Sequence, residues 1–219
     1  MKNIIILGAG GFAREVAWLI EEINNKNKQW NLLGFIEEGT KNLGLVLNNY
    51  KILGDFKWIE NNKTDNLFYI CAVGDPKLRS KFSETAEMLN LKPATLIHPD
   101  VKMSNYNIIG EGTIICAESI ITVNVKIGKH VVISVDSKIG HDSIIGDFST
   151  LLPSVTVSGN VNIGTRCIIG TSGAIICKIN IGSNTIVGAG ATVTKDLPDN
   201  CTAVGTPARP IKFHEFESN

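Results

Sequence analysis

The chain lacks the features that define several large classes of protein. Its 21 basic and 21 acidic side chains cancel, so no net charge points to nucleic acid or an anionic membrane as a partner. No apolar run is long enough to span a bilayer, and the one near residue 4 is too short for a signal peptide. The five cysteines include no C-x-x-C pair, which argues against a disulfide framework. We expect a reduced, cytoplasmic protein that neither enters membranes nor binds nucleic acid.

Aromatic residues and leucine are scarce in one part of the chain. Residues 95–196 hold two aromatic residues and three leucines against 20 isoleucines, whereas ten of the fourteen aromatic residues lie within 1–94. Isoleucine, glycine, serine and threonine without leucine favour strands and tight corners over helices. The contrast predicts two domains, residues 1–94 and residues 95–219, of which the second ends in a tail.

The second domain repeats every six residues. Seventeen apolar positions follow this spacing without an insertion from Ile97 to Val193, and glycine comes directly after eight of them. A helix would repeat at about 3.6 residues and an ordinary strand at 2. The pattern predicts a solenoid in which one aliphatic side chain per hexad points inward and the small residue after it allows a sharp corner.

This run of hexads resembles the hexapeptide-repeat acyltransferases, and residues 203–210 resemble the usual ending of that family. The resemblance implies a left-handed parallel β-helix in which three hexads form one coil of 18 residues. A solenoid without chemistry remains the alternative. Zinc enzymes share this fold, but His98, His130 and His141 occupy different positions in the hexad, so we expect no metal site.

The first domain opens like a nucleotide-binding turn. An apolar strand over residues 3–7 runs into Gly8, Gly10, Gly11 and Phe12, and an amphipathic helix is expected over about 14–23. Glycines let the backbone approach a phosphate, which the helix N–H groups then face. Further strands over 32–36 and 67–72 and a helix over 76–89 complete only half of a dinucleotide-binding fold. We therefore expect an α/β half-Rossmann domain that binds a nucleotide or nucleotide-sugar instead of NAD, with a ligand-free turn as the alternative.

Two more segments follow predicted strands and are expected to line the same crevice. Glu37 and Glu38 could accept hydrogen bonds from a ribose or base, and Gly74 with Asp75 follows another strand. A solvated loop is an equally good interpretation of the two glutamates.

Together the two halves resemble the bacterial sugar O-acyltransferase family, which includes sialic acid O-acetyltransferases and N-acetyltransferases of nucleotide-linked 4-amino sugars. The resemblance implies that the first domain holds the nucleotide-sugar. It also implies a homotrimer with acetyl-CoA between neighbouring β-helices.

The segment Gly140-His141-Asp142 matches the catalytic motif of that family. A neutral imidazole can take the proton of an attacking amine or hydroxyl, and a carboxylate beside it can orient the ring. One coil after His141 stands Gly159, whose N–H the resemblance assigns to the thioester carbonyl as an oxyanion donor. An exposed corner histidine without a catalytic role is the alternative.

The resemblance also suggests where acetyl-CoA binds. Thr150 stands where some relatives carry a second histidine, and it can form a hydrogen bond but cannot act as a base. Small residues would admit the pantetheine chain and basic residues would pair with the phosphates, although solvated surface charges explain the latter equally well. These candidates are Gly188, Ala189, Gly190, Lys195 and Arg209.

The sequence thus predicts an acetyl-CoA-dependent acetyltransferase that acts on the amine of a nucleotide-linked 4-amino sugar in bacterial surface-glycan synthesis. O-acetylation of sialic acid or another sugar hydroxyl is the alternative within the same family. An NAD-linked or zinc enzyme and a non-catalytic sugar-binding module remain more distant alternatives.

Overall fold

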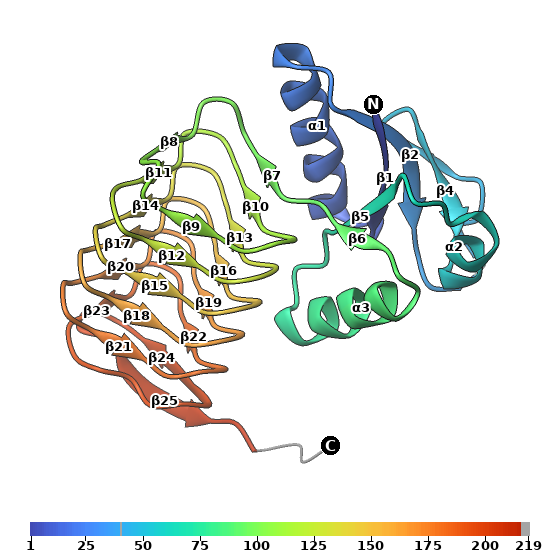
Figure 1. Cartoon of the computed structure of the whole chain (residues 1–219). Helices are drawn as coiled ribbons and strands as arrows, with labels where there is room; N and C mark the ends of the chain where they lie inside the picture. Colours follow the sequence, from blue (N-terminus) through green and yellow to red (C-terminus); the bar gives the residue numbers. More distant parts are fainter. Residues whose placement is uncertain (40, 216–219) are drawn as a thin grey trace. The chain divides into compact units, whose positions relative to one another are not determined.

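The computed structural model describes residues 1–39 and 41–215. The chain divides into two compact units, Met1–Pro99 and Asp100–Asn219, which differ entirely in architecture (Figure 1). The end of the predicted tail, residues 216–219, lies outside the described residues.

The first unit is built on one sheet with the strand order β3-β4-β2-β1-β5-β6, in which only the β3–β4 pair is antiparallel. Three helices accompany this sheet, and a short strand, β7, ends the unit. The elements are β1 (Lys2–Leu7), α1 (Gly11–Lys26), β2 (Trp30–Ile36), β3 (Val46–Leu47), β4 (Tyr50–Gly54), α2 (Phe56–Asn62), β5 (Leu67–Cys71), α3 (Pro76–Met88), β6 (Lys92–Pro93) and β7 (Leu96–Ile97).

The central strand β1 explains both the core and the position of the crevice. Its four residues from Ile4 to Leu7 are fully buried, as expected for an apolar run covered on both faces of a parallel sheet. Strand β1 pairs with β2 on one side and with β5 on the other, so the chain changes direction across the sheet at this strand. The carboxyl ends of β1, β2 and β5 therefore open on one edge, where ligands of such sheets bind.

The sequence pattern located the long elements of this unit and missed the short ones. The expected helix over 14–23 is longer at both ends, because Gly10 is the N-cap of α1 and the helix continues to Lys26. The expected helix over 76–89 is α3, which ends at Met88. Strands β3, β4 and β6 and helix α2 were not predicted, since two to seven residues are too few to show a periodicity.

The second unit is a parallel β-helix whose strands pair with strands one coil of 18 residues away, as Ile121 pairs with Ile139. The coils stack along three sheets (Figure 1). One sheet holds β10 (Ile114–Ile115), β13 (Val132–Ile133), β16 (Thr150–Leu151), β19 (Ile168–Ile169), β22 (Ile186–Val187), β24 (Cys201–Val204) and β25 (Arg209–Phe213). The second holds β8 (Lys102–Met103), β11 (Ile120–Ile121), β14 (Lys138–Ile139), β17 (Thr156–Val157), β20 (Ala174–Ile175) and β23 (Thr192–Val193). The third holds β9 (Ile108–Ile109), β12 (Lys126–Ile127), β15 (Ile144–Ile145), β18 (Asn162–Ile163) and β21 (Asn180–Ile181).

The aliphatic positions of the six-residue pattern form the core of this unit. Every one of them from Ile115 to Val193 is buried, whereas Met103 and Ile109, in the first coil, are half-buried. Burying an aliphatic side chain of this size contributes about 1.5–3 kcal/mol relative to leaving it exposed. The repeated burial stabilises the stack and fixes which residues point outward at each corner.

The corners arise differently from what the sequence suggested. The glycine after an inward residue has no left-handed backbone; it is needed because a side chain would collide with the next coil, as a Cβ on Gly140 would lie 2.6 Å from the backbone nitrogen of Gly159. The turn is made two residues later, at a position with positive φ in every coil. This left-handed position is occupied by Asn124 (φ 57°), Asp142 (φ 58°) and Asn160 (φ 57°) along one corner. Asparagine and aspartate tolerate this conformation better than most residues.

Candidate functional site

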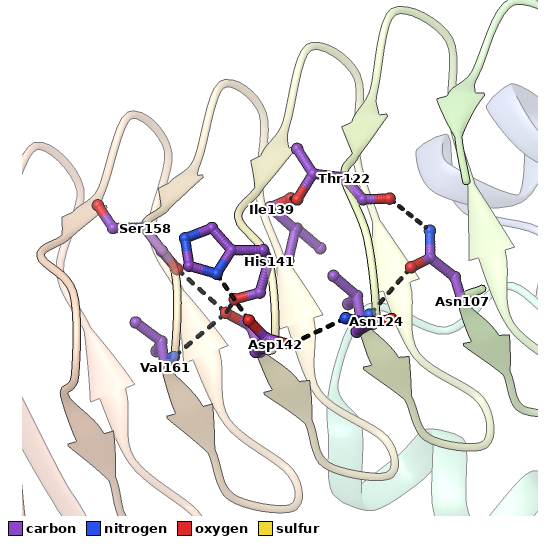
Figure 2. A network of polar contacts seen from close by, with 10 residues as sticks. Asn107, Thr122, Asn124, Ile139, His141, Asp142, Ser158 and Val161 are labelled. Carbon is purple, nitrogen blue, oxygen red and sulfur yellow. Dashed lines mark hydrogen bonds and ion pairs between the residues drawn. The ribbon is translucent and has the colours of Figure 1, made fainter. Parts of the chain in front are cut away.

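The corner between β14 and β15 carries the predicted catalytic pair. His141 and Asp142 are both about half exposed, and Nδ1 of the imidazole lies 2.8 Å from Oδ2 of the carboxylate. Figure 2 shows the ring and the carboxylate facing each other at this corner. Their contact follows from the local fold, because the left-handed turn at Asp142 brings its side chain back toward the residue before it.

Asp142 is held from its other side by the preceding coil. The amide Nδ2 of Asn124 donates a hydrogen bond of 3.1 Å to Oδ1 of Asp142, so both carboxylate oxygens accept a hydrogen bond (Figure 2). The bond from His141 and then the bond from Asn124 hold the pKa of Asp142 below its usual range. The carboxylate is therefore charged at neutral pH and can only accept. Hence Nδ1 of His141 carries the proton, and Nε2 keeps a lone pair for use as a base.

Gly159 lies directly against the imidazole, one coil further along. A Cβ placed on Gly159 would lie 2.5 Å from Nε2 of His141, so only glycine leaves room for the ring in this orientation. Within residues 1–39 and 41–215, the N–H of Gly159 has no hydrogen-bond acceptor. The coil arithmetic that paired these two residues is thus reproduced in space: a base and an unengaged backbone donor share one corner.

The same corner continues toward the end of the solenoid. Residues that follow strands of the second sheet stack at intervals of 18, which places Lys195 in line with His141 and Gly159. Cys177, which is exposed, stands between Gly159 and Lys195 and was not among the predicted site residues. The 18-residue spacing was the signal that could have located it.

Other predicted acetyl-CoA residues lie elsewhere on the β-helix. Thr150 is buried on β16, in a different sheet from the strands that flank His141. Arg209 is exposed on β25, and its Nη1 donates to the carbonyl of Ala208. A different corner of the coil, between β22 and β23, holds Gly188, Ala189 and Gly190. Within one chain these residues do not converge on His141.

In the first unit, the glycine turn has two distinct parts. Gly8 has φ +104°, and a Cβ there would lie 3.2 Å from the carbonyl oxygen of Ala72, so the fold itself requires glycine. Gly10 has φ −74°, which any residue adopts, and a Cβ there would meet no atom within 4 Å. The fold therefore does not explain Gly10, whereas close approach of a ligand would.

The beginning of α1 is open to an anion. Helices α2 and α3 are capped by the side chains of Asp55 and Asp75, whereas α1 begins at Gly10 with no side-chain cap and no acidic residue in its first turn. Its first N–H groups, near Gly11 and Phe12, thus face the carboxyl edge of the sheet without a competing acceptor from the cap residue. Uncapped N–H groups of this kind bind phosphate well.

The other two predicted crevice segments reach the same edge with different roles. Glu37 follows β2 and accepts a hydrogen bond of 2.8 Å from Nδ2 of Asn42, while Glu38 is exposed. After β5, Asp75 caps α3 by accepting from the N–H of Leu78.

The buried guanidinium of Arg79 shapes the turn after β5. Its Nη1 donates to the carbonyl of Val73 at 2.8 Å and to that of Gly74 at 3.1 Å, and burial lowers its pKa to about 10. Arg79, which the sequence suggested only as a neighbour of the crevice, thus has a structural role of its own.

Comparison with known proteins agrees with this geometry. The family model of the PglD N-terminal domain matches residues 3–86. GDP-perosamine N-acetyltransferase of Escherichia coli O157:H7 is 30% identical over 214 residues, which cover 94% of this chain and 95% of that protein. The chain belongs to the bacterial sugar O-acyltransferase family.

Solved structures of this family match the whole chain. A variant of perosamine N-acetyltransferase from Caulobacter crescentus, in complex with CoA and GDP-perosamine, is 26% identical with a TM-score of 0.89, covering 97% of this chain and 98% of that one. The acetyltransferase domain of PglB from Neisseria gonorrhoeae FA1090, in complex with acetyl coenzyme A, is 27% identical with a TM-score of 0.87, covering 96% and 99%.

These matches confirm several predictions made from the sequence. The fold class is the expected one, a half-Rossmann unit followed by a left-handed parallel β-helix. As a member of the bacterial sugar O-acyltransferase family, the chain is an acyltransferase, and acetyl-CoA is the expected co-substrate.

Two further observations concern metals and membranes. Among residues 1–39 and 41–215, no three histidine, cysteine, aspartate or glutamate side chains are placed to hold a metal ion. A search of the same residues for a helix with the length and apolarity of a membrane span found none.

Proposed function

We propose that this acyltransferase moves the acetyl group of acetyl-CoA to the 4-amino group of a nucleotide-linked sugar. Relatives over the full length of the chain are named as perosamine N-acetyltransferases, and one structure holds CoA together with GDP-perosamine. The observation that carries the proposal is the charged Asp142 behind His141, with Gly159 packed against the imidazole.

The corner supplies the groups that acetyl transfer to an amine requires. As the amine nitrogen bonds to the thioester carbonyl carbon, Nε2 of His141 takes its proton and Asp142 stabilises the resulting imidazolium. The N–H of Gly159 donates to the carbonyl oxygen while it carries negative charge. The carbon–sulfur bond then breaks, the CoA sulfur receives the proton from His141, and an amide remains on the sugar. His141 ends neutral, ready for another cycle.

The first domain, residues 1–94, is proposed to hold the nucleotide-sugar. The uncapped N-terminus of α1 and the open space at Gly10 suit a diphosphate. Glu37 and Glu38 at the end of β2 are placed for ribose or base hydroxyl and amino groups, although Glu37 already accepts a bond from Asn42. Gly74 and Asp75 would form the other wall, and Gly8, Gly11 and Phe12 the turn between them.

The second domain, residues 95–219, is proposed to hold acetyl-CoA along the catalytic corner. Lys195 stands in line with His141 and is not engaged by any residue of the described chain, so its ammonium can pair with a CoA phosphate. Arg209 would do the same. The remaining candidates, Thr150 and residues 188–190, do not share that corner within one chain. They could contribute only to the part of CoA that lies against another subunit.

This geometry favours a homotrimer. His141 is more than half exposed, and a surface hollow of the solenoid lies instead at Asn162, Asn180 and Asp196. A single corner offers one wall, so a neighbouring copy would supply the second wall of the acetyl-CoA site. Light scattering coupled to gel filtration should give three times the chain mass of 23.7 kDa. We place the enzyme in the cytoplasm, where both substrates are made.

Product analysis tests the proposed reaction. The purified chain should release CoA thiol when given acetyl-CoA and a 4-amino sugar linked to UDP, GDP, dTDP or CMP, and the base that gives the lowest KM identifies the nucleotide. The product should gain one acetyl group in a form that survives mild base, as an amide does. A product that loses acetyl in mild base would instead identify O-acetylation of a sugar hydroxyl, and no thiol release with any acceptor would refute the proposal.

A further inference from the structure

The buried serine beside the catalytic corner has a contact that its role as core filler does not require. The Ser143 side chain is fully buried, and its hydroxyl donates a 3.0 Å hydrogen bond to the carbonyl oxygen of Ser158. It also accepts a 3.2 Å bond from the N–H of Val161. The carbonyl of His141 is further away, at 3.5 Å, so the single hydroxyl proton goes to Ser158.

The carbonyl that Ser143 holds belongs to the same peptide group as the N–H of Gly159. A peptide group is planar, and the 158–159 bond is trans, so its C=O and N–H point in opposite directions. Because Ser143 draws the oxygen into the core, the N–H must face outward on the side of the corner. The orientation of the proposed oxyanion donor is therefore fixed from inside the coil.

The same hydrogen bond also strengthens that donor. A hydrogen bond to a peptide oxygen polarises the group and makes its N–H a better donor, an effect of about 10–30% per bond. On the other side of Gly159, the N–H of Asn160 donates to the carbonyl of His141 at 2.8 Å. The peptide at Gly159 is thus held by bonds before and after it, while its own N–H stays available.

The sequence around Ser143 supports a specific purpose. Residues one coil before and after it in the same inward column are Val125 and Val161, both fully buried. A hydroxyl buried between aliphatic neighbours costs free energy unless it is hydrogen bonded, and an aliphatic side chain suits this column. Serine therefore replaces an aliphatic residue in the coil whose hydroxyl reaches the peptide at Gly159.

We infer that Ser143 is a positioning residue for acetyl transfer, which orients and polarises the peptide N–H of Gly159 toward the thioester carbonyl oxygen. This inference rests on the proposed function of Gly159 as the oxyanion donor. Ser143 does not touch substrate; its effect passes through the Ser158–Gly159 peptide. Its contribution therefore appears in the chemical step and not in substrate binding.

Another corner of the solenoid provides a matched control. Ser149 is equally buried, and its hydroxyl donates to the carbonyl of Gly164 at 2.8 Å and accepts from the N–H of Cys167 at 3.0 Å. It bridges two coils just as Ser143 does, away from His141. At a third place Thr113 forms the same two bonds at 2.9 and 3.2 Å, so this kind of position accepts threonine.

The test compares three variants by steady-state kinetics and thermal unfolding. Ser143→Ala should lower kcat about tenfold, less than the 10²–10³-fold expected for loss of an oxyanion donor, with KM for both substrates within about twofold. Ser149→Ala should lower Tm as much as Ser143→Ala does but keep kcat within about twofold. Ser143→Thr should restore most of kcat. The acidic limb of the pH–rate profile should not move in any of them, because His141 and Asp142 are unchanged.

Each outcome decides between the inference and the proposed function. Equal losses of kcat in Ser143→Ala and Ser149→Ala, or a Ser143→Ala enzyme with the parental kcat, would overturn the positioning role alone. A rise in KM without a change in kcat would overturn it as well. If the parental chain transfers no acetyl group, or if His141→Ala is as active as the parent, the proposed function fails and the inference fails with it.

Discussion

The two units of this protein assemble their sites in opposite ways. In the α/β unit, the predicted ligand residues come from three loops at positions 8–12, 37–38 and 74–75, which only the strand order β2-β1-β5 brings to one edge. In the β-helix, the catalytic residues lie one coil apart on a single corner. A repeat turns sequence spacing into spatial position, whereas an open sheet requires the whole topology to be known. The following predictions, which accompany the Ser143 test, probe this contrast.

The largest effect is expected at the base itself. His141→Ala should lower kcat by about 10³-fold, since general base catalysis contributes 10²–10⁴-fold. Because the imidazole is more than half exposed, Tm should change by no more than about 2 °C. Thiol release with saturating substrates and a thermal melt measure the two quantities. A variant that retains kcat would show that the corner is only a structural turn.

The next effect tests the packing between adjacent coils. Gly159→Ala should lower kcat by about 10²-fold, because the new Cβ would lie 2.5 Å from Nε2 and force the imidazole away from Asp142. The side chain that must move is exposed, so the solenoid should fold normally. A crystal structure of the variant should show His141 in another rotamer. Gly159→Ala with full activity and an unmoved ring would contradict the geometry proposed for the corner.

A smaller effect, visible in the pH dependence, is expected for Asp142→Asn. Asparagine keeps the left-handed turn but removes the charge that stabilises an imidazolium, so kcat should fall about 30-fold. The acidic limb of the kcat/KM profile should move to lower pH, because the ring then protonates less readily. The lowered pKa of Asp142 means that its contribution to stability is present above the ordinary aspartate pKa and is lost as pH falls below it. The variant should lack that part of the acid sensitivity, which thermal melts at several pH values measure.

The smallest effect distinguishes fold from function in the α/β unit. Gly10→Ala should raise KM for the nucleotide-sugar about fivefold without changing Tm or KM for acetyl-CoA, because the new methyl group occupies open space at the proposed phosphate site. Gly8→Ala is the control for a structural glycine and should lower Tm by several degrees, since φ +104° strains any other residue. Equal behaviour of the two variants would remove the argument for a ligand at Gly10.

How much the sequence predicted differs between the units for the same reason. The six-residue period located the inward residues and paired His141 with Gly159, because each position in the repeat has one place in space. It misjudged the corner, since the pattern showed glycines but not which residues adopt positive φ. In the α/β unit, the sequence found β1, α1 and α3. It could not show that Asp75 caps a helix, or that Arg79 folds back onto the carbonyls of Val73 and Gly74. Those contacts depend on loop conformations that have no periodicity.

The pairing of residue n with residue n + 18 has a consequence for how this enzyme can change over generations. Loss or duplication of a whole coil after residue 178 would alter the length of the solenoid and leave His141, Ser143 and Gly159 in phase. A single-residue insertion between 141 and 159 would instead turn Gly159 off the corner unless it bulged outward. Gene variants in this segment should therefore accumulate substitutions freely but tolerate insertions and deletions almost only in multiples of one coil.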